Sequence, residues 1–309
     1  MRFKFGAEPI KLSLAALFVV ACWAYAPIGI HVGLGAYGPS HLALLRFLIA
    51  SVFLTVVAVI KHVHLPKIND FPFLFILGLF AVTLHHIALN FGQEGIGAGA
   101  ASVLAQSTPI FTAILARFFL REVVSLLRWA CIAGGVTGAT IIVIGNRGIT
   151  SFDYHGLLII AAAISWSIYF CLQRKCTTKY DMLSVVCCTV WMGTAQLCIY
   201  LPGLGKEIIA APLNVNFAVL LLGIFPSALA YLGWAYVLRH VEVSRASIAL
   251  YFIPPTAIIM ASVILNEKPT ASVLVGGAIV ITSILTMNLD QSDRRPNNPC
   301  PRKNVGRSP

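Results

Sequence analysis

Two adjacent histidines, His85 and His86, and a nearby amide, Asn90, stand in an otherwise apolar run of residues. An ionisable side chain in such a run is costly to bury, so it marks a candidate functional position. A neutral histidine there can bind a polar solute, and because its ordinary pKa is about 6.5 it can also couple transfer of a proton. Neighbouring residues point about 100° apart on a helix, so we expect at most one of the pair to face a common site. The alternative is a histidine hydrogen-bonded to a neighbouring helix.

Two further runs each present a polar face beside a proline. Proline frees a backbone carbonyl about one turn earlier, and a free carbonyl next to an amide or a phenol suits a zwitterion. The alternative is a kinked helix with a packed tyrosine. The faces are Ser102, Gln106 and Pro109 in one run and Ser247, Tyr251 and Pro254 in the other, with the same spacing of i, i+4 and i+7.

Aromatic side chains deep in other runs complete the set of candidates. Trp23 and Trp166 each lie about ten residues into a run, too deep for the aromatic belt of a membrane surface, so they either line a cavity or pack in the core. Glu122 and Glu267 lie beside helix ends, where capping or gating contacts are favoured. The predicted substrate-binding residues are Trp23, His86, Asn90, Gln106, Trp166, Tyr169, Tyr231, Trp234 and Tyr251, and the predicted gating or coupling residues are His85, Pro109, Glu122, Pro254 and Glu267.

Other chemistries lack their motifs. The eight cysteines include no Cys-x-x-Cys pair with a companion histidine spacing, as a zinc site would need. No GxxxxGK[ST] loop is present for ATP, and no Ser/His/Asp or paired-carboxylate arrangement stands out. We therefore predict no metal, no cofactor, no catalytic residue and no enzyme activity. Arg46 lies about four residues into its run, and we interpret it as reaching outward or pairing with Glu94.

The elements that position these residues are apolar runs long enough to cross a membrane. The 309 residues are 58% hydrophobic and 11% charged, with a mean hydropathy of +0.86, whereas a soluble domain is about 25% charged. A helix needs about 20 apolar residues to cross a bilayer, and continuous rather than alternating runs favour helices over a barrel. We predict an all-α integral membrane protein of ten transmembrane helices. The runs are 12–32, 42–60, 71–90, 96–120, 126–144, 156–172, 182–201, 217–238, 243–265 and 271–289.

The basic residues indicate the orientation. The net charge is +11, but Lys and Arg lie in short loops and in the tail, so they predict topology and contact with anionic lipid rather than binding of nucleic acid. Alternate connections carry 18 of them on one side and 3 on the other. The positive-inside rule then places both termini in the cytoplasm, in a multi-pass protein of the cell (inner) membrane. Residues 290–309 form a polar cytoplasmic tail that we expect to be disordered.

Matching residues recur at a fixed distance along the chain. A separation of 145 residues relates the pairs Gly78 and Gly223, Ala101 and Ala246, Ser102 and Ser247, Pro109 and Pro254, and Glu122 and Glu267. The same offset places His86 opposite Tyr231. A unit of five spans is odd-numbered, so its second copy must start from the opposite side of the membrane. We predict two inverted five-helix repeats, residues 12–145 and 155–289, a design typical of secondary transporters.

The residues of this repeat also resemble a known family. Residues 97–102, Pro109 and Glu122, echoed by residues 243–247, Pro254 and Glu267, resemble the two EamA-type domains of the drug/metabolite transporter superfamily, over about residues 12–289. The Arg46–Phe47 pair resembles the family's usual Arg-Phe pair. The resemblance implies ten helices, a central cavity, and exchange or proton-coupled export of amino acids or other metabolites.

Three functions remain open at the level of sequence. The leading hypothesis is a secondary transporter that exports a small neutral or zwitterionic metabolite, such as an amino acid, by alternating access. The second is an importer of a nucleoside or cofactor-like metabolite, and the third is a membrane-embedded enzyme. An anionic cargo would need a cation deep in the site, and few candidates exist. The expected partners are a small-molecule substrate and the bilayer, with proton coupling and oligomeric state left open.

Overall fold

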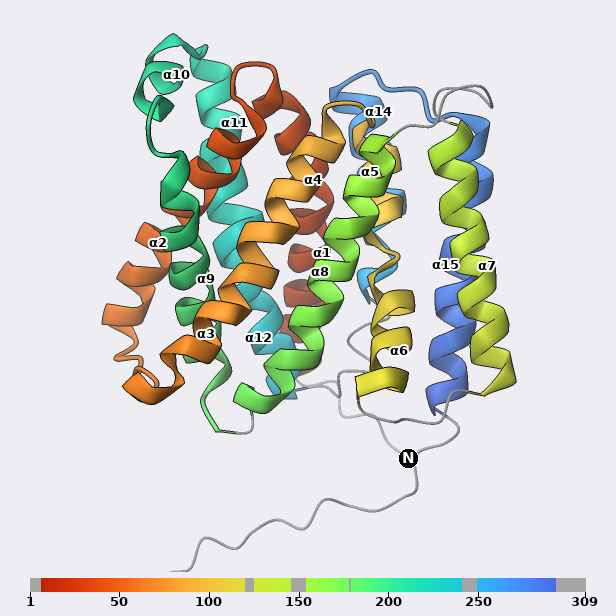
Figure 1. The fold of residues 1–309 in the computed structure, drawn as a ribbon, viewed down its shortest axis with the longest axis horizontal. Coiled ribbons are helices and arrows are strands. Elements are labelled where there is room, and N and C mark those ends of the chain that lie inside the picture. Colours follow the sequence, from red (N-terminus) through yellow and green to blue (C-terminus); the bar gives the residue numbers. More distant parts are fainter. Residues whose placement is uncertain (1–6, 120–124, 146–153, 178, 241–248, 293–309) are drawn as a thin grey trace, which may run out of the picture.

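The computed structural model describes residues 7–119, 125–145, 154–177, 179–240 and 249–292, and every regular element in these ranges is a helix (Figure 1). Glu122 and the tail beyond residue 292 lie outside the described residues. The first half contains α1 (Ala7–Leu34), α2 (Pro39–Ile60), η1 (Ile68–Asp70), α3 (Phe71–Gly78), η2 (Leu79–Leu84), α4 (His85–Gln93), α5 (Ala98–Ala105), α6 (Thr108–Phe119) and α7 (Leu126–Gly145). The second half contains α8 (Tyr154–Thr177), α9 (Met182–Leu197), η3 (Cys198–Tyr200), α10 (Leu204–Ala210), α11 (Leu213–Ile224), η4 (Phe225–Leu229), α12 (Ala230–His240), α14 (Ile253–Ile264) and α15 (Ala271–Ser292).

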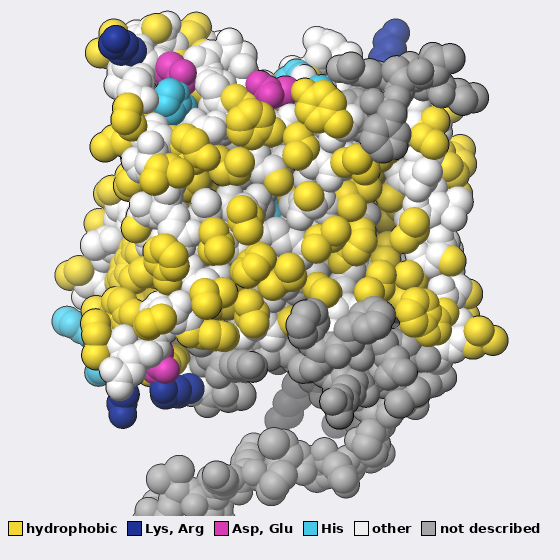
Figure 2. All heavy atoms as spheres, in the orientation of Figure 1, with side chains coloured by type: hydrophobic (Ala, Val, Ile, Leu, Met, Phe, Trp, Pro, Cys, Tyr) yellow, Lys and Arg dark blue, Asp and Glu magenta, His cyan; other side chains and the backbone are white. Residues whose placement is uncertain are grey.

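Several of these helices have the length and composition to cross a membrane. Within the part of the chain that the structure describes, six segments qualify, and three apolar helices are shorter. Figure 2 shows hydrophobic side chains covering the middle of the visible face, with the coloured charged side chains near its two ends. The six segments are Lys11–Leu34, Pro39–Ile60, Ile68–Gln93, Tyr154–Gln173, Met182–Tyr200 and Leu213–Trp234, and the shorter helices are Trp129–Gly145, Ile253–Ile264 and Ala271–Thr286.

The predicted fourth and ninth spans are interrupted rather than continuous. α5 ends at Ala105 and α6 begins at Thr108, with a turn at Gln106 and Ser107 between them. A turn at Tyr251 and Phe252 likewise precedes α14. Each interruption comes two or three residues before a proline, which removes a backbone donor and prevents the preceding turn from continuing.

A second pair of irregularities follows the same 145-residue offset. The segments η2 and η4 are π-helical and directly follow, or nearly follow, Gly78 and Gly223. An isolated π-helical turn is rare and is often found at functional sites. Two kinds of helix defect therefore recur at matching positions in the two halves.

The helix after the second interruption runs antiparallel to α5. Glu267 follows the C-terminal end of α14, and its carboxylate accepts hydrogen bonds from the backbone N–H groups of Ala98 (3.0 Å) and Gly99 (3.3 Å) at the N-terminal end of α5. The end of one interrupted span therefore meets the beginning of the other.

The helices α7 and α15 pack closely side by side at one edge of the bundle (Figure 1). A Cβ atom added at Gly138 would lie 2.6 Å from the carbonyl oxygen of Gly276, and the reverse contact is equally short. Glycine at both positions lets the two backbones touch, as small residues do between membrane helices.

A methyl group at Gly78 is expected to destabilise the protein, because its Cβ would lie 2.5 Å from the backbone nitrogen of Gly193 on α9. Overpacking of this kind typically costs about 1–3 kcal/mol. Gly78→Ala should therefore lower the melting temperature of the purified protein in detergent. Gly205→Ala is the matched control, since nothing lies within 4 Å of its Cβ position. Equal melting temperatures for the two variants would show that α3 and α9 are not packed as described.

Candidate functional site

Trp166, halfway along α8, lies at the centre of a group of aromatic rings. Its ring centroid is 4.6 Å from that of His85, 5.1 Å from Tyr169, 6.2 Å from Tyr231 and 6.4 Å from His86. Such distances suit edge-to-face and tilted aromatic packing. Because His86 and Tyr231 are related by the repeat offset, Trp166 contacts equivalent positions of both halves.

Trp23 of α1 extends this group on the side of the second half. Its ring lies 6.0 Å from Tyr231 and 5.8 Å from Trp234. Its indole N–H donates to the carbonyl of Pro226 at 3.2 Å. Pro226 belongs to the π-helical segment η4, where an extra residue in the turn frees backbone groups for such contacts. We call the seven residues Trp23, His85, His86, Trp166, Tyr169, Tyr231 and Trp234 the aromatic cluster.

Both histidines belong to the cluster, whereas the angle between neighbours on a helix predicts that at most one of them faces a common site. Their rings are 4.5 Å apart and nearly perpendicular. The ring of Trp166 lies close enough to contact both, because α8 crosses α4 at the position where the π-helical segment η2 ends. His85 also donates from Nδ1 to the carbonyl of Ala162 at 2.8 Å, since a carbonyl can only accept.

Arg46 lies in this region, and the interpretation that it reaches outward or pairs with Glu94 is wrong. Its side chain is 2% exposed. Its Nε and Nη2 atoms donate to the Ser227 hydroxyl at 3.0 and 2.8 Å, and Nη1 lies 3.4 Å from Nδ1 of His86. The helix α2 begins at Pro39 rather than near residue 42, which places Arg46 about 10 Å from the helix start at 1.5 Å per residue. That depth explains why its head group cannot reach the surface.

Asn90 lies one turn beyond His86 on α4 and is completely buried. Its amide nitrogen donates to the carbonyl of Pro39 at 2.9 Å, while its Oδ1 has no hydrogen-bond partner among the described residues. Gln93 repeats this arrangement one turn later, with a bond of 2.9 Å to the carbonyl of Pro27 and an unpartnered Oε1. Gln93 is not among the predicted site residues, because the sequence places it in the connection between the runs 71–90 and 96–120, whereas the structure buries it on α4.

Four of the predicted residues lie at the helix interruptions: Gln106, Pro109, Tyr251 and Pro254. Among the described residues, no ring contact or hydrogen bond joins them to the aromatic cluster. Gln106 and Tyr251 form the two turns themselves. Gln106 is half-buried, and Tyr251 is buried and packs in the core. Pro109 and Pro254 are the second residues of α6 and α14.

Contacts between the halves join the helix ends on one side of the bundle. Besides the Glu267 contacts, Glu207 pairs with His41 at 2.7 Å and accepts from the backbone N–H of Gly38 at 3.1 Å. Tyr37 donates to the side-chain oxygen of Asn216. Burial, and then the Glu207 carboxylate, raise the pKa of the Tyr37 phenol above its ordinary value. A pocket of about 340 Å³ adjoins Glu267 at this end.

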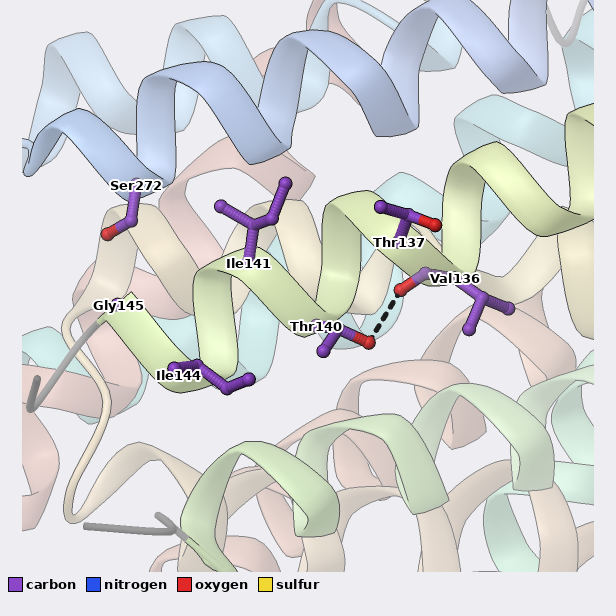
Figure 3. Close-up of a pocket in the computed structure, with 7 residues that line it drawn as sticks. All are labelled: Val136, Thr137, Thr140, Ile141, Ile144, Gly145 and Ser272. Atoms are coloured by element: carbon purple, nitrogen blue, oxygen red, sulfur yellow. Dashed lines mark hydrogen bonds between the residues drawn. The ribbon is translucent and has the colours of Figure 1, made fainter. Parts of the chain in front are cut away.

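A groove of about 400 Å³ lies away from the cluster, along α7 beside Ser272 of α15 (Figure 3). Its lining is almost entirely apolar. The hydroxyls of Thr137 and Thr140 donate to carbonyls of their own helix, at 2.9 and 2.8 Å. With its hydroxyls already bonded, the groove suits a lipid chain better than a polar solute.

The comparison with protein families matches both halves. The model of the EamA-like transporter family matches residues 10–144 and 155–289. The chain belongs to the EamA-like transporter family. The predicted resemblance is thereby confirmed, and with it a membrane protein of a transporter family.

Named relatives of this EamA-like chain are transporters. It is 35% identical over 278 residues to the "Uncharacterized transporter YdfC" of Bacillus subtilis, covering 90% of each chain. It is 32% identical over 288 residues to the "Probable terminal-alkyne amino-acid exporter" of Streptantibioticus cattleyicolor, covering 92% of this chain and 96% of the relative. One solved crystal structure of a protein shares the fold at a TM-score of 0.64 and 16% identity, over 93% of this chain and 99% of that one. Relatives named as transporters are consistent with a protein that is not an enzyme.

Proposed function

We propose that this chain is a secondary transporter that exports a small neutral or zwitterionic metabolite, such as an amino acid, by alternating access. The observation that carries the proposal is the aromatic cluster, which takes His86 from one half and Trp166 and Tyr231 from the other. Secondary transporters built from repeats bind cargo at the interface of the halves, next to interrupted helices. The name of the relative from Streptantibioticus cattleyicolor supports an amino acid as cargo.

The proposed topology is ten spans in two inverted five-span repeats, residues 12–145 and 155–289, with both termini and the tail 290–309 in the cytoplasm. The paired π-helical segments and the paired interruptions support the repeat. The antiparallel meeting of α14 and α5 at Glu267 supports the inversion. The proposed location is the cell inner membrane, where the basic loops face the cytoplasm.

The proposed cargo site is the aromatic cluster together with Asn90. The residues of the interruptions, Gln106 and Tyr251, extend this site towards α6 and α14. Pro109 and Pro254 keep those helices interrupted. Glu267 holds one end of the bundle closed. Glu122 precedes Glu267 by the same 145 residues that relate the two repeats, and we assign it the corresponding role from the sequence alone.

Sealed proteoliposomes containing the purified protein test this function. A panel of radiolabelled amino acids and nucleosides is offered in both directions, with and without a pH gradient. We expect at least one amino acid to cross faster than in protein-free liposomes, and a gradient effect would identify proton coupling. Movement of nucleosides alone would favour the importer reading. Chemical conversion of a panel member in detergent, without any movement in sealed vesicles, would instead indicate an enzyme and contradict the proposal.

A further inference from the structure

Arg46 is a buried cation without an acidic partner among the described residues. None of the described Asp and Glu residues forms an ion pair with it, and its contacts are the Ser227 hydroxyl, the His86 ring and the face of Phe47, whose centroid lies 5.2 Å away. The phenol of Tyr231 lies within electrostatic range. A cation in the membrane interior is expected to pair with an anion or to mark a path for one.

The hydrogen bonds of Arg46 leave part of its donor capacity unused. A guanidinium group has five N–H donors. Two of them point to Ser227 and one to His86, so two remain without a partner among the described residues. The Ser227 hydroxyl is saturated, because it also donates to the carbonyl of Leu222 at 3.0 Å.

The contact between Arg46 and His86 determines which nitrogen of the His86 ring carries the proton. Arg46 can only donate, so Nδ1 of His86 must accept, and a neutral ring then carries its proton on Nε2. Nε2 is fully buried and has no hydrogen-bond partner among the described residues, and the His86 side chain is 5% exposed. An unpaired donor of the ring therefore stands beside the unpaired donors of the guanidinium.

The positive charge of Arg46 and the free N–H donors of Arg46 and His86 match the negative charge and the two acceptor oxygens of a carboxylate. The planar fork of arginine matches the two oxygens of a carboxylate. The rings of Trp166 and Phe47 flank His86, at 6.4 and 4.5 Å, and provide an apolar wall for the rest of a cargo molecule.

We propose that Arg46 and His86 bind the carboxylate of the cargo, so that the transporter selects molecules that carry a carboxylate, amino acids among them. This inference rests on the proposed function and narrows its substrate class. Buried Arg46 supplies the deep cation that an anionic group needs, for which the sequence offers few candidates.

The test compares each acid with its own neutral derivative on the solubilised full-length protein. Tryptophan fluorescence and ligand-induced thermal shift report binding of alanine, phenylalanine, propionate and benzoate, and of the corresponding amides. We expect at least one acid to bind tenfold or more tightly than its amide. Arg46→Gln should abolish that preference and Arg46→Lys should retain part of it, whereas Lys206→Gln, which removes an exposed positive charge, should leave it unchanged.

Equal binding of acids and amides by the natural protein would overturn the proposal, and so would failure of every acid to bind. Neither result depends on a variant folding. If the acids bind preferentially but nothing crosses the proteoliposomes, the carboxylate site stands and the transport function falls. If the amides, offered to the same proteoliposomes, cross as fast as the acids, transport stands and the carboxylate site falls.

Discussion

Trp166→Ala should reduce transport of the identified cargo by about 30-fold or more while the protein remains folded. The Trp166 ring contacts four other rings of the cluster, and each aromatic contact is worth about 0.5–1.5 kcal/mol. In the proposed site, loss of the ring also removes the surface at which both halves meet the cargo. At about 1.4 kcal/mol per tenfold, a loss of about 2 kcal/mol in cargo binding gives this factor.

The matched control for this variant is Trp129→Ala. Trp129 lies on α7 and is 43% exposed, away from the cluster, so its removal should leave the transport rate within about twofold of the natural protein. Trp166→Phe, which keeps a ring, should fall between the two. Initial rates in proteoliposomes with matched protein content measure all three. A Trp166→Ala protein that transports at the natural rate would exclude the cluster as the cargo site.

Glu267→Ala should open the end of the bundle at which α14 meets α5. The carboxylate accepts two backbone hydrogen bonds across the halves, and a hydrogen bond to a charged group contributes about 1.5–3 kcal/mol. At about 1.4 kcal/mol per tenfold, losing one of these bonds should shift the balance between closed and open forms of this end by at least about tenfold, and losing both by about a hundredfold or more. Transport should then slow, because the cycle needs this end to close again.

Thiol labelling measures the opening. A cysteine at Ser102, which is buried on α5, is placed in an otherwise cysteine-free chain and exposed to a membrane-impermeant maleimide. Labelling should rise at least tenfold in the Glu267→Ala background and less in Glu267→Gln, which keeps one acceptor oxygen. Lys268→Ala controls for loss of the neighbouring exposed charge. Unchanged labelling in Glu267→Ala would mean that this contact does not hold the end closed.

The membrane class and the repeat followed from the sequence because both depend on local and periodic information. Long uncharged runs identify helices in lipid, and the 145-residue offset pairs Gly78 with Gly223 and Pro109 with Pro254. The two spans were predicted as continuous, with a kink beside each proline as the alternative, so the interruptions are a finding of the structure. The π-helical segments were not predicted, because a single extra residue in a turn leaves no distinct mark in an apolar sequence.

The partners of individual side chains were harder to predict. Arg46 and Ser227 are 181 residues apart in the chain, and no sequence pattern in either run predicts their contact. The predicted depth of Arg46 depends on where α2 begins. The predicted start at residue 42 is three residues later than the observed start at Pro39, so the prediction placed Arg46 too close to the surface. The contact of both histidines with Trp166 was also not predicted, because the angle between neighbours on a helix does not exclude a third ring that contacts both.

Countertransport shows most directly whether the two halves expose one site alternately to the two sides of a membrane. Proteoliposomes are loaded with an excess of unlabelled cargo and diluted into buffer containing a trace of the labelled form. We expect the label to accumulate transiently above its equilibrium level, at a rate higher than in empty proteoliposomes. Entry of label at one rate regardless of loading, with no overshoot, would contradict alternating access.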